Sequence, residues 1–215
     1  MPFRAVLFDF DGTLADSYDA ITASVNHVRQ QHALPPLAED KVRRMVGRGL
    51  LQLMADVVPG GDPGADGKIY HAHHPSVMFE MTRLLPGVGQ GILDLNAAGL
   101  KLAVCSNKPV AITRKLLDSL KVATLFDAAY GPEDAGAAKP DPAMVHLAIQ
   151  KLGVPAPETL YVGDMPVDVE TARNAGIPVW VVPTGSSSAD ELRRVKPDRL
   201  FENMTDLIFA VLFRP

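Results

Sequence analysis

The stretch Ala5–Leu14 reads AVLFDFDGTL and joins a run of apolar residues to two aspartates, Asp9 and Asp11, and a glycine. A buried strand that ends in two carboxylates is costly, because like charges repel each other and each loses hydration. Residues i and i+2 of a strand lie on the same face, so both carboxylates are expected over one ligand. The rest of the chain should therefore supply groups that offset this charge.

Further apolar runs follow the first one, and two of them end in a small or polar residue, Ser106 and Gly163. They lack period-2 alternation, which is typical of parallel strands covered on both faces. The expected strands are Ala5–Phe10, Lys101–Ser106, Thr159–Gly163 and Pro178–Val182, with a weaker one at Ala128–Tyr130. The helical patterns between them are Gly89–Ala98, Val110–Leu120, Pro142–Leu152 and Asp168–Ala175. Alternating strands and helices predict an α/β fold, with a Rossmann-like core built on a parallel sheet.

Residues 16–84 break this alternation, because their apolar periodicity predicts helices and no strand. A loop rich in proline, glycine and aspartate, Pro59–Gly67, divides the segment. We therefore expect a small all-helical cap domain, residues 16–84, inserted after the first strand. The Rossmann-like core would then consist of residues 1–15 and 85–215.

The composition of the 215-residue chain is that of an ordinary globular protein, with 47% hydrophobic and 21% charged residues. A net charge of −4 argues against non-specific binding to nucleic acid or to an anionic membrane. No apolar stretch reaches the ~18–20 residues that a membrane-spanning helix needs. The single cysteine, Cys105, excludes an intrachain disulfide and suits a reducing compartment. We expect a cytoplasmic protein without a nucleic-acid or membrane partner, either a monomer or a weak homodimer.

Polar residues follow later strands in the same way as the two aspartates follow the first. One strand ends at Ser106, which Asn107 and Lys108 follow, and another is followed by Asp164 and Asp168. Lys139 stands in the segment AKPDP, ahead of the helix that leads into that second strand. In parallel α/β sheets, ligands bind beyond the carboxyl ends of the strands, so these groups are expected in one crevice.

The charges in this crevice favour a metal ion. Four carboxylates against one lysine leave it strongly negative, and Mg²⁺ is the usual partner of a few carboxylates and a phosphate. The absence of cysteine and histidine from the group argues against zinc. Beside Mg²⁺, one aspartate can attack phosphorus and form an aspartyl-phosphate, while the other donates a proton to the leaving oxygen and later takes one from water. A hydroxyl, a lysine and backbone N–H groups make a phosphate cradle.

The ordered set DxDGT, Ser106, Lys139 and GDxxxD resembles the four motifs of the haloacid dehalogenase-like hydrolase superfamily, from Phe8 to about Gly185. Three longer stretches look most like phosphoglycolate phosphatases, namely SNKP, GPEDAGAAKPDP and VGDMPVDVETARNAG. The resemblance implies a Mg²⁺-dependent phosphatase of a small phosphorylated metabolite, with 2-phosphoglycolate first among the candidates. It also implies that the helical insertion is the family's small α-helical cap.

The same resemblance implies roles for the motif residues. Asp9 would be the nucleophile and Asp11 the general acid and base. Asp9, the backbone carbonyl of Asp11 and Asp164 would hold Mg²⁺, with Asp168 behind these ligands. The alternative for Asp168 is that it caps the helix it opens. The residues expected to bind the phosphoryl group are Ser106, Asn107 and Lys139.

Other functions stay open at this point. A phosphomutase of the same superfamily would return the phosphoryl group to its substrate, and a pyrophosphatase would use similar groups. A non-catalytic phosphate-binding module is a further alternative, which the intact set of aspartates, serine and lysine disfavours. As a rule, dehalogenases of the superfamily lack the second aspartate of the first motif, so Asp11 argues against that activity.

Two features of the expected cap raise further hypotheses. Arg48 stands between two glycines and could pair with a carboxylate of the substrate, since guanidinium geometry suits carboxylates. A surface arginine in a turn is the equal alternative. His71, His73 and His74 in the segment HAHHP are expected to be solvated and not metal ligands, because a proline follows them and no cysteine or acidic pattern joins them.

Overall fold

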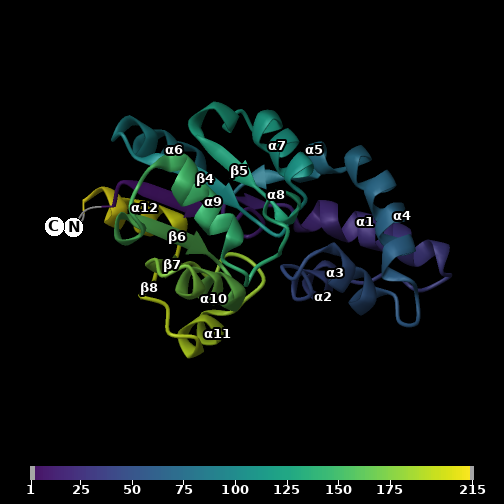
Figure 1. Cartoon of the computed structure of the whole chain (residues 1–215). Coiled ribbons are helices and arrows are strands. Elements are labelled where there is room, and N and C mark those ends of the chain that lie inside the picture. The colour runs from purple at the N-terminus through teal and green to yellow at the C-terminus, as the bar shows by residue number, and fades with distance from the viewer. Residues whose placement is uncertain (1–2, 214–215) are drawn as a thin grey trace.

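The computed structural model describes residues 3–213. Its core is a six-stranded parallel sheet with the strand order β5-β4-β1-β6-β7-β8 (Figure 1). The strands are β1 (Ala5–Phe8), β4 (Lys101–Cys105), β5 (Ala128–Tyr130), β6 (Thr159–Gly163), β7 (Val179–Val181) and β8 (Arg199–Leu200). Counted within the core alone, this order is 3-2-1-4-5-6, that of the doubly wound Rossmann fold. The predicted α/β fold with a Rossmann-like sheet is confirmed.

Helices cover both faces of this sheet. They are α6 (Val88–Ala97), α7 (Val110–Ser119), α8 (Pro132–Ala135), α9 (Ala143–Leu152), α10 (Pro166–Asn174), α11 (Ala189–Arg194) and α12 (Met204–Leu212). Successive side chains of a strand point to opposite faces, so Val6 and Phe8 pack with α6, α7 and α12, whereas Leu7 packs with α9, α10 and α11. Burial on both faces explains why the strands appear in the sequence as continuous apolar runs.

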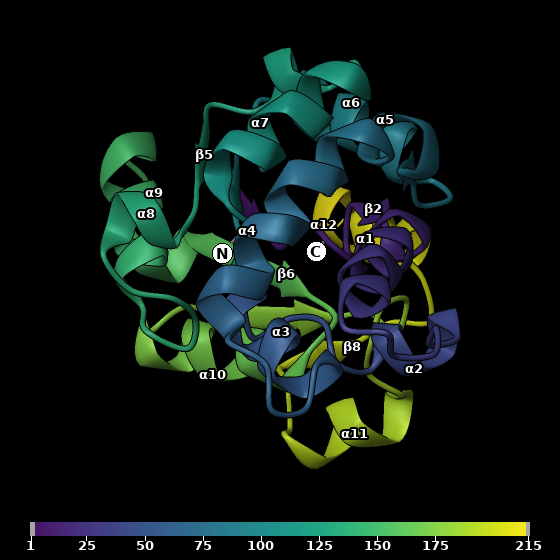
Figure 2. The ribbon, with the colours of Figure 1, turned by 90° about the vertical axis from the view of Figure 1, so that its right-hand side faces the viewer.

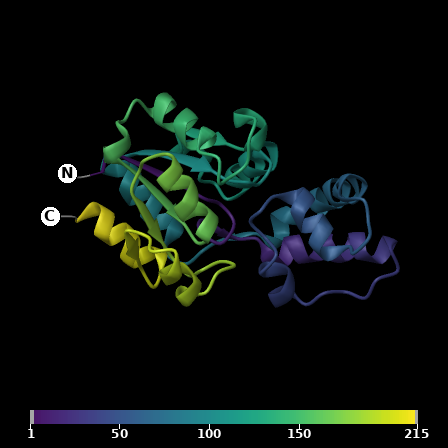
Figure 3. The ribbon, with the colours of Figure 1, turned by 60° about the horizontal axis from the view of Figure 1, so that its bottom comes forward.

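Four further helices form a second lobe, the cap, with an apolar cluster of its own (Figure 3). They are α1 (Tyr18–Gln31), α2 (Glu39–Arg43), α3 (Leu50–Val57) and α4 (Pro63–His73). The short helix α5 (Met78–Met81) leads back to the core, and its Met78 packs in the core cluster. Between residues 3 and 213, no helix combines the length and the apolar character needed to cross a membrane.

A two-stranded antiparallel ribbon connects the two lobes. Strand β2 (Ala15–Asp16) leads into the cap and pairs with β3 (Arg83–Leu84), which leads out of it. The expectation of helices without any strand in residues 16–84 was therefore wrong at both ends of the segment. Strands of two residues show no periodicity, and their pairing joins positions far apart in the sequence. A cap held by two adjacent chain crossings can move as a hinged lid.

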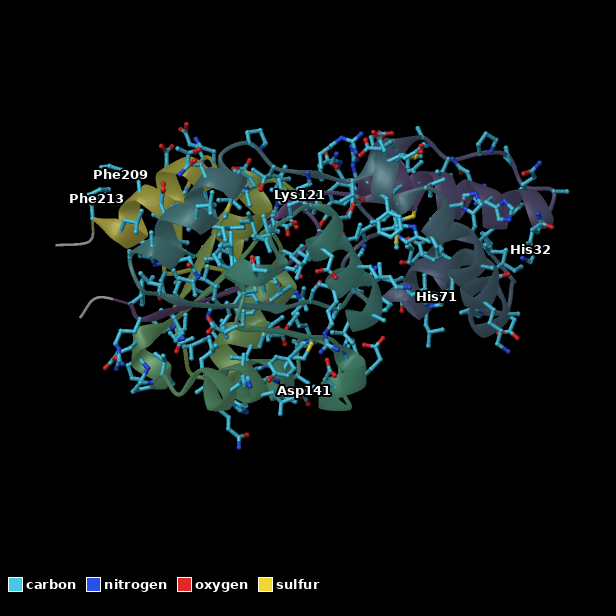
Figure 4. The ribbon with its side chains drawn as sticks, turned by 90° about the horizontal axis from the view of Figure 1, so that it is seen from above. His32, His71, Lys121, Asp141, Phe209 and Phe213 are labelled. Carbon is cyan, nitrogen blue, oxygen red and sulfur yellow. The ribbon has the colours of Figure 1, made fainter. Side chains whose placement is uncertain are left out.

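The cap lies beyond the carboxyl ends of β1 and β4, and Figure 2 views the molecule from this side. Residues that follow these two strands share a cavity with residues of α1, α3 and α4. Phe209 and Phe213 mark the opposite end of the core, remote from the cap (Figure 4). The cavity is therefore at the edge of the sheet where parallel α/β proteins bind ligands.

Candidate active site

The carboxyl end of β1 delivers Asp9 and Asp11, and the chain turns immediately afterwards at Gly12. The φ angle of Gly12 is +83°, a left-handed conformation that L side chains rarely adopt. A Cβ at this position would lie 2.6 Å from Gly185 Cα and 2.8 Å from Asp164 Oδ2. Glycine is thus required by both conformation and space, and it lets the exit of β1 contact the loops that follow β6 and β7.

Lys139 lies between two buried carboxylates at the centre of the site. Its Nζ is 2.9 Å from Asp9 Oδ1 and 2.7 Å from Asp168 Oδ1, and it donates to the Tyr161 hydroxyl at 3.3 Å. The side chain is only 1% exposed. Burial lowers the pKa of Lys139, but the charges of Asp168 and Asp9 outweigh burial and hold this pKa well above its ordinary value. Lys139 is therefore a fixed positive charge beside Asp9.

Asp9, Asp164 and Asp168 bring carboxylate oxygens within 4.8 Å of one another, and all three are buried. Asp164 accepts hydrogen bonds from the Thr13 hydroxyl and the Ser186 backbone N–H, both at 3.0 Å. No lysine, arginine or histidine in residues 3–213 forms an ion pair with Asp164. Burial, followed by the charges of Asp168 and Asp9, raises the pKa of Asp164 well above its usual range. A hard cation with oxygen ligands would remove this excess of negative charge, so the cluster fits a metal ion.

Asp168 differs from Asp164 in having both oxygens engaged by protein groups. Its Oδ2 accepts from the backbone N–H groups of Asp164 at 3.1 Å and Met165 at 3.0 Å, at the start of α10. Its Oδ1 accepts from Lys139. Burial raises the pKa of Asp168 to about 6, although Lys139 acts in the opposite direction. These contacts cap the helix and fix the positions of Asp164 and Lys139.

Asp11 is paired with Lys108, a residue for which the sequence predicted no role. Lys108 Nζ lies 3.0 and 3.1 Å from the two carboxylate oxygens of Asp11, and the Ser17 hydroxyl also donates to Asp11. The Lys108 side chain is only 6% exposed. Asp11 and Lys108 are 97 positions apart and meet because β1 and β4 pair in parallel. The only signal in the sequence was the position of Lys108, two residues after Ser106.

Ser106 and Asn107 follow β4 and are both buried. Ser106 Oγ accepts a hydrogen bond from the Lys108 backbone N–H at 3.3 Å and lines the cavity. Asn107 Oδ1 accepts from the Lys139 backbone N–H at 2.7 Å, and its Nδ2 donates to the Gly47 carbonyl of the cap at 3.1 Å. The amide of Asn107 therefore links the cap to the segment that carries Lys139. Its contact with a phosphoryl group stays a prediction.

The cavity between core and cap opens over Asp9 and Asp11. Its cap wall is mainly apolar, and the polar side chains that the cap contributes are Tyr70, His71 and His74. His71 lies on the side of the cap that faces the core (Figure 4). The core side of the cavity is therefore charged, whereas the cap side is mainly apolar.

Arg48 is not among the residues that line this cavity, although Gly47 and Gly49 are. Its guanidinium lies 3.2 Å from Asp56, and its side chain is 63% exposed. Gly47 has a φ angle of +120°, and a Cβ there would clash with the Met165 side chain of the core. The first glycine therefore serves the close approach of cap and core. The predicted contact between Arg48 and substrate has no support in this arrangement.

The expectation of solvated cap histidines was wrong for His74. This residue is 1% exposed, its Nδ1 lies 2.9 Å from the Ser24 hydroxyl, and its ring stacks on Tyr70 with centroids 4.9 Å apart. Burial, followed by the charge of Lys108, lowers the pKa of His74 to about 3, so the ring is neutral. The hydrogen-bond partner of Nδ1, Ser24, comes from α1, and no local pattern around HAHHP predicts this contact.

A sequence model of haloacid dehalogenase-like hydrolases matches residues 6–182, which include all the motif residues described above. The chain belongs to this superfamily. A phosphoglycolate phosphatase of Rhodospirillum rubrum is 35% identical to it over 195 residues, which cover 86% of this chain and 81% of that protein. The predictions of the superfamily and of a phosphoric monoester hydrolase are confirmed.

Solved structures agree with this haloacid dehalogenase-like assignment. A protein described as a predicted phosphoglycolate phosphatase from Haemophilus somnus 129pt has a TM-score of 0.90 at 26% identity, covering 97% of each chain. A haloacid dehalogenase-like hydrolase from Bacteroides fragilis has the same TM-score, 0.90, at 28% identity, covering 95% of this chain and 99% of that one. The likeness spans nearly the full length of each chain.

Proposed function

We propose that this haloacid dehalogenase-like hydrolase is a cytoplasmic, Mg²⁺-dependent phosphatase that hydrolyses 2-phosphoglycolate through an aspartyl-phosphate. The observation that carries the proposal is the position of Asp9. It follows β1 directly, its carboxylate lies 2.9 Å from the Lys139 ammonium and within 4.8 Å of a carboxylate oxygen of Asp164, and it lines the cavity under the cap. The similarity to proteins named phosphoglycolate phosphatase supports the choice of substrate.

Asp9, the backbone carbonyl of Asp11 and Asp164 would hold Mg²⁺. The donor set fits, because carboxylate and carbonyl oxygens are the ligands this ion prefers and Asp164 is buried without a cationic partner in residues 3–213. When bound, Mg²⁺ supplies positive charge that stabilises the charge developing on the phosphoryl oxygens. Asp168 would stay behind this set, since both of its oxygens are already engaged.

In the first step, a carboxylate oxygen of Asp9 attacks phosphorus, and the bond between phosphorus and the substrate oxygen breaks. Lys139 and the Ser106 hydroxyl, together with backbone N–H groups after β4, would hold the phosphoryl oxygens. Both side chains are buried and held by neighbouring groups. A fixed phosphate cradle of this kind costs little reorganisation during the reaction.

Asp11 would give its proton to the leaving oxygen in this first step. In the second step it takes a proton from the water that attacks the aspartyl-phosphate, which releases phosphate and regenerates Asp9. Ser17 and Lys108 hold the Asp11 carboxylate over the cavity. The apolar wall of the cap would exclude bulk water while the ester bond breaks.

The proposal is tested by a screen of phosphorylated metabolites, 2-phosphoglycolate among them, with Mg²⁺ and with EDTA. We expect steady release of phosphate that EDTA abolishes and added Mg²⁺ restores. Phosphorylation of the protein without turnover would favour a phosphomutase. No release from any ester in the panel would contradict the proposed function.

A further inference from the structure

The charge that a substrate meets in the cavity comes largely from the core. The lining residues include two carboxylates, Asp9 and Asp11, one lysine, Lys108, and no arginine in the described part of the chain. Lys139 lies behind Asp9, between it and Asp168. Lys108 is therefore the lysine that lines the space beside the reacting groups.

Lys108 is held in place before any substrate binds. Its Nζ contacts both oxygens of Asp11 and lies 5.8 Å from the centre of the Phe10 ring. Its backbone N–H donates to Ser106 Oγ at 3.3 Å. An ammonium group has three N–H donors, and Asp11 accounts for two of them. One donor remains for a ligand, on a side chain that loses little further freedom on binding.

The cap contributes three polar side chains to the cavity wall, Tyr70, His71 and His74, and two of them, Tyr70 and His74, are neutral. Lys108 and His74 both line the cavity, and the charge of Lys108 contributes to the low pKa of His74. Tyr70 stacks on His74, and burial raises the pKa of its hydroxyl, so the phenol also stays neutral. Charge pairs in such surroundings are stronger than in water. Tyr70 and His74 would therefore strengthen a contact between Lys108 and an anion without themselves supplying a competing cation.

We propose that Lys108 binds a second anionic group of the substrate, a carboxylate close to the phosphoryl group. Lys108 would then select phosphate monoesters of short hydroxy acids over uncharged esters. This inference rests on the proposed phosphatase activity and refines its substrate class. It replaces the prediction that Arg48 serves this purpose, because Arg48 pairs with Asp56 outside the cavity lining.

The position of Lys108 in the chain suits a carboxylate near the phosphoryl group. The Lys108 backbone N–H donates to Ser106 Oγ, and both residues line the cavity, so one small ester would reach Ser106 with its phosphoryl group and Lys108 with its carboxylate. The Asp9 carboxylate would repel a substrate carboxylate in this cavity unless a cation met it. A neutral ester needs no such partner.

The test compares two substrates of similar size, 2-phosphoglycolate and 2-hydroxyethyl phosphate, in the wild type and in Lys108→Met. Methionine removes the charge and keeps an unbranched side chain of similar length. We expect the preference for 2-phosphoglycolate, the ratio of the two kcat/KM values, to fall about 10- to 150-fold, as for loss of one charged hydrogen bond. Lys108 also contacts Asp11, so both rates can fall, but the ratio removes any loss common to the two substrates.

Arg48→Met is the matched comparison, since it removes a cation from the cap outside the cavity lining, and its ratio should equal that of the wild type. Lys108→Gln provides a second variant, used if Lys108→Met does not show cooperative unfolding. An unchanged ratio in the Lys108 variants, or a loss only in Arg48→Met, would overturn the proposal. A wild type that hydrolyses other phosphomonoesters but does not prefer 2-phosphoglycolate would also overturn it. A wild type without activity on any phosphomonoester would instead contradict the phosphatase function itself.

Discussion

Asp9 is the residue that the proposed reaction needs most, and its Oδ1 lies 2.9 Å from Lys139 Nζ. We predict that Asp9→Asn lowers kcat by ~10³-fold or more, because the amide is a poor nucleophile. The measurement is steady-state turnover, together with acid trapping of the phosphorylated wild type and peptide mapping of the label. Asp118→Asn, an exposed change on α7, should leave turnover unaltered. A label on Ser106 or on a histidine would contradict the assignment.

Asp11 should matter most when the leaving group is poor. General acid assistance is worth ~10²–10⁴-fold only where the departing oxygen needs a proton. Asp11→Asn should therefore slow hydrolysis of alkyl phosphates by more than that of activated aryl phosphates. Asparagine keeps an oxygen that can accept from Lys108 and Ser17, which limits rearrangement of the cavity. Equal losses of turnover for both kinds of ester would argue against this role, provided that breakdown of the phosphoenzyme is fast and does not limit turnover.

The site residues that could be predicted from the sequence are those that directly follow a predicted strand. Asp9, Ser106 and Asp164 each follow an apolar run, and the structure brings them to one edge of the sheet. The sequence did not predict that Lys108 pairs with Asp11 or that His74 is buried. Both depend on contacts between distant parts of the chain, the first across 97 positions and the second across 50. Sequence patterns over a few neighbouring residues do not predict contacts between such distant positions.

Among the elements, the loop at Gly47 and the loop after β4 hold the cap against the core. A Cβ at Gly47 would clash with Met165, whereas a Cβ at Gly49 would meet nothing within 4 Å. Both glycines have positive φ, +120° and +90°, so alanine strains the backbone at either position. Comparing the two alanine variants therefore isolates the contact between cap and core.

We predict that Gly47→Ala lowers kcat/KM about 10-fold or more relative to Gly49→Ala, because the cap can no longer close on Asn107 and Met165. Met165→Ala should restore part of this loss in the double variant, since it removes the atoms that clash. The measurement is kcat/KM for all three variants and for Met165→Ala alone. No rescue, or equal losses at the two glycines, would mean that backbone strain and not cap closure is responsible.

The elements themselves were predictable to different degrees. β1, β4, β6 and β7 are apolar because helices cover both of their faces, so their positions followed from composition alone. The strands β2, β3 and β8 have two residues each and were not expected. Such strands exist because a neighbouring strand supplies hydrogen bonds, as Leu84 does opposite Ala15. Pairing of this kind is a tertiary property that a short window of sequence does not show.

The buried carboxylates of the site lower the free energy of unfolding of the whole protein when they are ionised. Burial raises the pKa of Asp168 to about 6 and that of Asp164 well above its usual range, whereas an unfolded aspartate titrates near 3.9. Between these values the folded protein binds more protons than the unfolded chain. The stabilising contribution of Asp168 is therefore fully present below about pH 4 and is lost as pH rises through about 6, and that of Asp164 is also lost as pH rises. At neutral pH, the metal-free protein should be destabilised by its own active site.

We predict that Mg²⁺ raises the midpoint of thermal unfolding, because the proposed site would bind it in the folded protein and not in the unfolded chain. At a Mg²⁺ concentration about 100 times Kd, the linkage amounts to about 2.7 kcal/mol, or roughly 5–10 °C for a chain of this size. The shift should be smaller near pH about 5, where protons compete with the metal for Asp164. The measurement is thermal unfolding in EDTA and in Mg²⁺ at both pH values. Asp164→Asn should raise the midpoint in EDTA and show little response to Mg²⁺. A Mg²⁺ response in Asp164→Asn equal to that of the wild type would place the metal elsewhere.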